Sequence, residues 1–182
     1  MASIFGHVAL GVTLGKLLLP DPRYLRYWLL AAACAFLPDI DVVGFRFQVP
    51  YASLWGHRGL THSLFAAAMV ASASVALVRL FHRQAGPPPG RLWVLVFLAT
   101  ASHGVLDAMT TGGLGVAFFS PFRLERYFFG FNPIEASPTG IRQFVGSTVW
   151  RVLQSEAIWV ALPCALLLTV QRLFSRQTAV AR

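Results

Sequence analysis

The chain has 182 residues and a formal net charge of +8; 56% of its residues are hydrophobic and only 12% are charged. Soluble domains usually carry about 25% charged residues, so the composition argues against a water-facing globule, a coiled coil, a disordered chain and a soluble nucleic-acid binder. It favours one all-α integral membrane domain over residues 1–182. The positive charge then reflects basic cytoplasmic loops, and no nucleic-acid partner is expected.

Five apolar segments are expected to form helices, because Ala, Leu and Gly dominate them and no alternating barrel pattern is visible. They lie at about residues 4–19, 24–37, 64–81, 92–109 and 158–174. A full crossing needs about 20 residues, so the first two are short and either span with help from flanking residues or are partly re-entrant. Pro163 is expected to kink the last segment. The sequence thus predicts a bundle of about five transmembrane or partly re-entrant helices.

The connections between these segments differ in character. Residues 20–22 form a tight break, and the Gly- and Pro-rich stretch 86–90 excludes a helix. The connection at about 111–149 is long and carries an aromatic cluster, Tyr127, Phe128, Phe129 and Phe131. Long loops in small proteins are usually functional, and aromatic side chains favour the membrane interface.

If all five segments cross, the chain alternates sides and its charged residues separate. One side receives nine of the fifteen cations and a single acid, Asp21; the other receives six cations and six acids. The nine cations are Lys16, Arg23, Arg26, Arg79, Arg83, Arg91, Arg172, Arg176 and Arg182. The positive-inside rule then predicts that this basic side, with the C-terminus, is cytoplasmic. The chain is expected to be a multi-pass inner-membrane protein with its N-terminus outside.

The extracytoplasmic side carries most of the residues that can bind metals. They are His7, Asp39, Asp41, His57, His62, His103 and Asp107. The last two stand four residues apart, so both project from one helix face. Ionisable residues at membrane depth are costly and mark functional sites. Mixed imidazole and carboxylate ligands suit zinc, with manganese or iron as alternatives. Seven candidates exceed the needs of one catalytic zinc, so we expect one or two divalent ions.

Each candidate also has an ordinary structural explanation. His7 alone is typical of a polar contact between helices, and the two aspartates after Pro38 are suited to ending a helix. The two loop histidines fit an interfacial loop, and the His–Asp pair fits a hydrogen-bonded core pair. Their shared location on one membrane face favours a metal site over these explanations. His82 falls on the opposite side and is interpreted as a solvated loop histidine.

Several motifs around these residues resemble the YdjM-like family of membrane-bound, metal-dependent hydrolases of bacterial inner membranes and archaea. The most specific is His57-Arg58-Gly59-Leu60-Thr61-His62-Ser63. The others are His7 with Gly11, Leu37-Pro38-Asp39-Ile40-Asp41, His103-Gly104-Val105-Leu106-Asp107, Thr110-Thr111-Gly112-Gly113, and Ser120-Pro121-Phe122 with Arg123. The resemblance covers about residues 1–130 and implies hydrolysis without an assigned substrate. A weaker similarity to zinc-dependent phospholipase C, an all-helical enzyme, implies attack on a phosphodiester.

These observations predict metal-assisted hydrolysis of a phosphoester in a lipid or lipid-linked substrate. Asp39, Asp41 and Arg58 are the candidate catalytic residues. Arg58 has two open interpretations: a guanidinium fork that holds phosphate, or an ion pair with Asp41 or another carboxylate. Arg123 and Arg126 are either headgroup-binding or snorkelling cations.

Two other functional classes stay open at this stage. A small metal-ion or proton-coupled transporter also uses intramembrane His and Asp residues, but it should place them through the membrane depth, and here they crowd one face. A structural membrane protein with a metal staple is the third class. Membrane lipids are the expected partners, and no oligomeric state follows from the sequence.

Overall fold

The computed structural model describes residues 1–81, 86–138 and 147–180, and in these ranges it contains helices and irregular segments but no strand. The α-helices are α1 (Ile4–Leu18), α2 (Leu25–Phe36), α3 (Leu64–Phe81), α4 (Pro89–Ala108), α6 (Ser147–Glu156) and α7 (Leu162–Val180). The same described ranges also contain three 3-10 segments, η1 (Pro22–Tyr24), η2 (Leu37–Phe47) and η3 (Leu60–His62), and a π-helical turn, η4 (Ala157–Ala161). The all-α prediction is confirmed.

Within the described ranges, four continuous helical segments are long and apolar enough to cross a membrane: Pro22–Phe47, Leu64–Phe81, Pro89–Ala108 and Thr148–Ser175. As expected, α1 is shorter, with 15 residues. The second segment is longer than predicted, because Pro38 lies in the first turn of the 3-10 segment η2, which continues from α2 to Phe47. A proline is tolerated in a first helical turn, where its missing N–H has no intrahelical acceptor.

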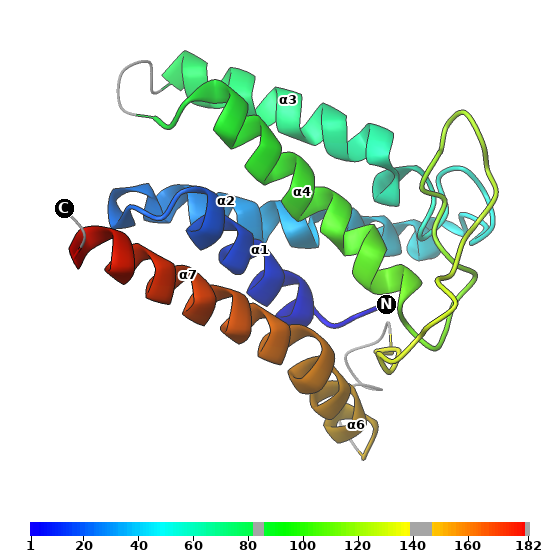
Figure 1. Cartoon of the computed structure of the whole chain (residues 1–182). Helices are drawn as coiled ribbons and strands as arrows, with labels where there is room; N and C mark the ends of the chain where they lie inside the picture. The colour runs from blue at the N-terminus through cyan, green and yellow to red at the C-terminus, as the bar shows by residue number, and fades with distance from the viewer. Residues whose placement is uncertain (82–85, 139–146, 181–182) are drawn as a thin grey trace.

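The helices run back and forth along one direction, as the five-pass prediction requires (Figure 1). The N-terminus, the ends of α2 and α4 and the start of α3 lie at one end of the bundle. The ends of α1, α3 and α7 and the starts of α2 and α4 lie at the opposite end. Helix α4 packs against α1, α2 and α3, and α7 packs against α1. This arrangement gathers the predicted metal ligands at the N-terminal end.

Close packing between these helices depends on glycine at two positions. A Cβ atom on Gly11 would lie 2.8 Å from the Ala31 carbonyl oxygen, so α1 can contact the backbone of α2 only without a side chain there. A Cβ atom on Gly104 would lie 2.9 Å from the His62 carbonyl oxygen. The second contact brings the His62 segment directly against α4, one residue after His103.

The last transmembrane segment changes its helical geometry next to Pro163. The π-helical turn η4 ends two residues before this proline, whose ring crowds the carbonyl group four residues earlier. The irregularity therefore falls where the proline predicts a kink. Glu156 ties this segment to α1, because its buried carboxylate accepts hydrogen bonds from the backbone N–H and hydroxyl of Ser3.

Candidate metal centre

Four buried side chains converge at the N-terminal end of the bundle: Asp39, His62, His103 and Asp107. One ligand atom from each lies within 4.8 Å of the others. The two imidazole Nε2 atoms are 3.0 Å apart. His103 Nε2 lies 3.3 Å from Asp39 Oδ1, and His62 Nε2 lies 3.6 Å from Asp107 Oδ2. Two nitrogens and two carboxylates thus face one small volume, which is the donor set that a zinc-like ion prefers.

Local helix geometry explains which side chains meet. His103 and Asp107 are one helical turn apart on α4, with Nε2 and Oδ2 separated by 4.0 Å. Asp39 and Asp41 lie in the 3-10 segment η2, where successive residues turn by about 120°. The two carboxylates therefore point to different neighbours: Asp39 approaches His103, whereas Asp41 contacts His57.

Two members of this region have polar atoms that the protein leaves unsatisfied. Both oxygens of Asp39 and both ring nitrogens of His7 are buried and have no hydrogen-bond partner among the described residues. The His7 ring stacks on His103 with centroids 3.8 Å apart, and its Nε2 lies 3.7 Å from Asp107 Oδ1. Burial of an uncompensated carboxylate is costly, so the site fits a bound cation next to Asp39.

Hydrogen bonds on the far side of the two histidine rings orient their Nε2 atoms. His103 Nδ1 lies 2.7 Å from the Ala35 carbonyl oxygen, which requires an N–H at that position. His62 Nδ1 lies 3.0 Å from the Thr61 hydroxyl oxygen, to which it is hydrogen-bonded, and 3.2 Å from Asp41 Oδ2. These contacts leave Nε2 available for a metal. Such partners are typical of metal-binding histidines.

Asp41 lies behind this centre rather than in it. Its carboxylate accepts hydrogen bonds from the Thr61 hydroxyl at 2.6 Å and from the Arg58 backbone N–H at 3.2 Å, and it lies 2.7 Å from His57 Nδ1. Asp41, His57 and His62 also form a second group with metal-ligand spacing. The geometry therefore offers one compact four-residue centre and one adjacent group that shares His62.

The charge around His62 favours a cation in this region. Burial opposes protonation of His62, but the neighbouring carboxylates of Asp107, Asp39 and Asp41 outweigh burial and raise its pKa to about 10. In the absence of an ion, a proton on this ring balances the surrounding carboxylates. A metal has to replace that proton, because only the neutral imidazole is a ligand.

Arg58 is completely buried and forms an ion pair with Asp107, Nε to Oδ2 at 2.9 Å. Its Nη2 donates to Thr110 Oγ1 at 2.9 Å, and its Nη1 donates to the Gly112 carbonyl at 2.7 Å. A Cβ atom on Gly113, where φ is +94°, would lie 2.5 Å from Nη1. These contacts fit the ion-pair interpretation of Arg58 rather than the phosphate-binding one. The partner in the ion pair is Asp107 and not Asp41.

The Thr110–Gly113 motif and Arg126 both contact the segment that contains His57 and Arg58. The motif wraps around the Arg58 guanidinium, a role that its spacing in the sequence does not reveal. Arg126 donates to the carbonyl oxygens of His57 and Tyr51 at 2.9 and 2.8 Å, and so holds the 51–58 segment in place. Arg123 instead is exposed.

All seven predicted metal ligands therefore lie at one end of the bundle. Four form the centre, His7 lies beside it, and the Asp41–His57 pair lies behind His62. The four aromatic side chains of the long connection, residues 127–129 and 131, are exposed. His82 lies outside the described residues, as do Arg83 and Arg142.

Buried His and Asp side chains at one end of a bundle of membrane-length helices define a multi-pass membrane protein with a candidate metal centre. The model of the family described as YdjM inner membrane protein matches residues 1–179, and the chain belongs to this family. The chain is 36% identical over 172 residues to inner membrane protein YbcI of Escherichia coli (strain K12). The aligned region covers 92% of this chain and 95% of that protein. No solved structure matches the chain. The resemblance is thus confirmed and extends well beyond residue 130.

Proposed function

We propose that the chain is a metal-dependent hydrolase that cleaves a phosphoester of a lipid or lipid-linked substrate at the membrane face. The observation that carries this proposal is the unsatisfied Asp39 carboxylate facing two converged imidazole nitrogens. Zinc is the expected ion, with manganese or iron as alternatives, and one or two ions per chain fit the residues present. When bound, such an ion supplies Lewis acidity toward water and a phosphoryl oxygen.

The residues of this chain then divide into three roles. Asp39, His62, His103 and Asp107 hold the ion. Neither Asp39 oxygen has a hydrogen-bond donor among the described residues, so this carboxylate would be free to hold the ion and to accept a proton from water. Asp41 orients His62 through Nδ1, and Arg58 holds Asp107 in place. His7 is a further ligand or a neighbour that excludes water.

The location of the centre supports a lipid substrate over a soluble one. The ligands lie at one end of membrane-length helices, where a phosphate headgroup is held while its acyl chains stay in the bilayer. A transporter needs ligands along the membrane depth, and this group of described His and Asp residues is confined to one end. Uptake of radioactive zinc into liposomes containing the protein would favour the transporter.

The test is metal analysis of the detergent-purified full chain, followed by a phospholipid hydrolysis screen. We expect zinc at one or two equivalents and release of a phosphate-containing product. A chelator should abolish the activity and added zinc should restore it. Activity should rise with pH while protons still compete for the ligands. Activity that survives the chelator, or that is confined to carboxylic esters, would contradict the proposal.

We also propose that the centre faces the extracytoplasmic side, because the basic residues gather at the opposite end. Reporter fusions after Arg83 and after Arg182 should both give cytoplasmic signals. An extracytoplasmic signal at either position would place the centre on the other side of the membrane.

A further inference from the structure

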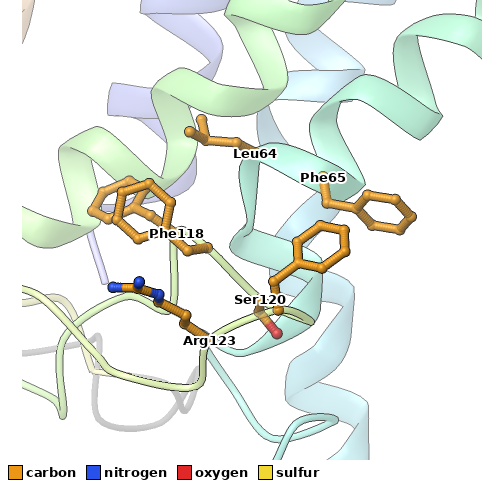
Figure 2. A pocket seen from close by; sticks show the side chains of 7 residues that line it. Leu64, Phe65, Phe118, Ser120 and Arg123 are labelled. Carbon is orange, nitrogen blue, oxygen red and sulfur yellow. The ribbon is translucent and has the colours of Figure 1, made fainter.

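An apolar groove of about 530 Å³ lies between the first turn of α3 and the 118–123 segment (Figure 2). Its lining residues are Leu64, Phe65, Phe118, Phe119, Ser120, Phe122 and Arg123. The volume falls within the range of small-molecule sites. Five of the seven lining side chains are large and apolar, and one is a cation. None of them belongs to the metal centre.

We propose that this groove binds an acyl chain of an anionic phospholipid, with the phosphate directed toward Arg123. The inference rests on the proposed function for the chemical class of the substrate and adds a site that recognises it. Lipid binding is measured separately from hydrolysis, so the lipid site and the hydrolase activity can each be rejected without rejecting the other.

The position of the groove on α3 gives a lipid chain direct access to it. Leu64 and Phe65 begin this helix, which is 18 residues long and has a mean hydropathy of 2.0, and only 11% of its residues are buried. The face of α3 turned away from α4 is therefore open to acyl chains along the helix. A chain that lies against this helix reaches Leu64 and Phe65 without crossing water.

The inner wall of the groove lies directly beside the metal centre. The Phe118 carbonyl accepts a hydrogen bond from the Leu64 N–H at 3.0 Å, which joins the two walls directly after the His62–Ser63 turn. A Cβ atom on Gly104 would lie 3.2 Å from the Phe118 ring and 2.9 Å from the His62 carbonyl. The groove therefore lies next to two residues, His62 and His103, whose imidazoles face the proposed ion.

The two polar residues of the groove match the polar parts of a phospholipid. Ser120 is fully buried, and its hydroxyl has no hydrogen-bond partner among the described residues. It is a donor suited to an ester carbonyl. Arg123 is exposed and forms none of the ion pairs found in the described parts of the chain, so its guanidinium can pair with a phosphate. Arg126, by contrast, donates to protein carbonyls.

The experiment uses the full chain in nanodiscs that contain phosphatidylglycerol with a diazirine near the end of one acyl chain. After illumination, mass spectrometry maps the crosslinked residues. We expect crosslinks concentrated at Phe65, Phe119 and Phe122, and at least fivefold fewer in Leu64→Trp, which fills the groove. Leu77→Trp is the matched control, because Leu77 is an exposed residue of α3 outside the groove. Metal content should be unchanged in both variants, which shows that the centre is intact.

A second pair of variants tests the headgroup. Arg123→Gln should lower the crosslinking preference for phosphatidylglycerol over phosphatidylcholine severalfold. Arg46→Gln, which removes an exposed cation outside the groove, should not change it. An unchanged preference in Arg123→Gln would overturn the assignment of the phosphate to this side chain.

The crosslinking results test the lipid site independently of the proposed hydrolase activity. Crosslinks spread evenly over the exposed faces of α3 and α7, or equal yields in the two tryptophan variants, would overturn the lipid site even if the protein hydrolyses phospholipids. Crosslinks confined to the groove in a protein that is inert on every phospholipid would support the site and reject the proposed function.

Discussion

At the N-terminal end of the bundle, one group of charged side chains is buried and converges; at the opposite end the described arginines are exposed and spread apart. The first end holds Asp39, His62, His103 and Asp107 around one small volume, with the fully buried Arg58 against Asp107. The second end holds Lys16, Arg23, Arg26, Arg79, Arg91 and Arg172. In the described part of that end, the acid–base pair is Arg23–Asp21, whose side chains are 70% and 47% exposed.

This difference predicts how strongly each end depends on its individual side chains. Removing one partner of a buried ion pair leaves an uncompensated charge and costs about 3–5 kcal/mol, whereas an exposed pair contributes about 0–1 kcal/mol. Substitutions at the N-terminal end should therefore change metal content or folding. Equivalent substitutions at the basic end should change little.

The largest expected effect is loss of the metal. His103→Ala removes a ring whose Nε2 lies 3.0 Å from that of His62, and Asp39→Asn replaces the unsatisfied carboxylate with a neutral, poorer ligand. Elemental analysis of each purified variant should show metal at background level, while membrane insertion is retained. Full metal content in both variants would mean that the ligand set is wrong.

Replacement of Arg58 should cost folding stability. Arg58→Met leaves Asp107 buried without its ion-pair partner and removes three hydrogen-bond donors, so the free energy of unfolding should fall by about 3–5 kcal/mol. Arg58→Lys keeps the charge and should lose less. Thermal unfolding in detergent measures both effects. If Arg58→Met unfolds at the wild-type temperature but is inactive, the phosphate-binding interpretation of Arg58 becomes the better one.

The helical architecture was predictable because hydropathy reports directly on burial in a bilayer. Each expected apolar segment contains a helix, and the i, i+4 spacing of His103 and Asp107 placed both side chains on one face. The alternation of sides then brought distant histidines to the same end. These inferences need only local periodicity and the parity of crossings.

The separate roles of the side chains in the centre could not be predicted from local periodicity or from the parity of crossings. The 3-10 geometry of η2 separates Asp39 from Asp41, yet the sequence shows only two aspartates after a proline. The Ala35 carbonyl that orients His103 is a backbone group and leaves no mark in the sequence. The partner of Arg58 is 49 residues away, so only the packed structure selects Asp107 over Asp41.

Asp41 should have a smaller effect than the ligands themselves. Asp41→Asn weakens the orientation of His62 and His57 but removes none of the four central side chains. Loss of such an orienting partner typically lowers metal affinity by about 10–100-fold. Competition with a fluorescent zinc chelator measures the change, and Asp21→Asn is the control with unchanged affinity. A loss as complete as in His103→Ala would make Asp41 a direct ligand.

The smallest effect is expected at the basic end, where Arg23 Nε lies 3.0 Å from Asp21 Oδ2. That distance is close to the 2.9 Å of the Arg58–Asp107 pair, so the two pairs differ in burial and not in length. Arg23→Gln should leave metal content unchanged and should lower the unfolding temperature by no more than about 2–4 °C. Water can replace the lost partner of the exposed Asp21, whereas Asp107 is fully buried. If Arg23→Gln destabilises the protein as much as Arg58→Met, burial is not what makes the two ends different.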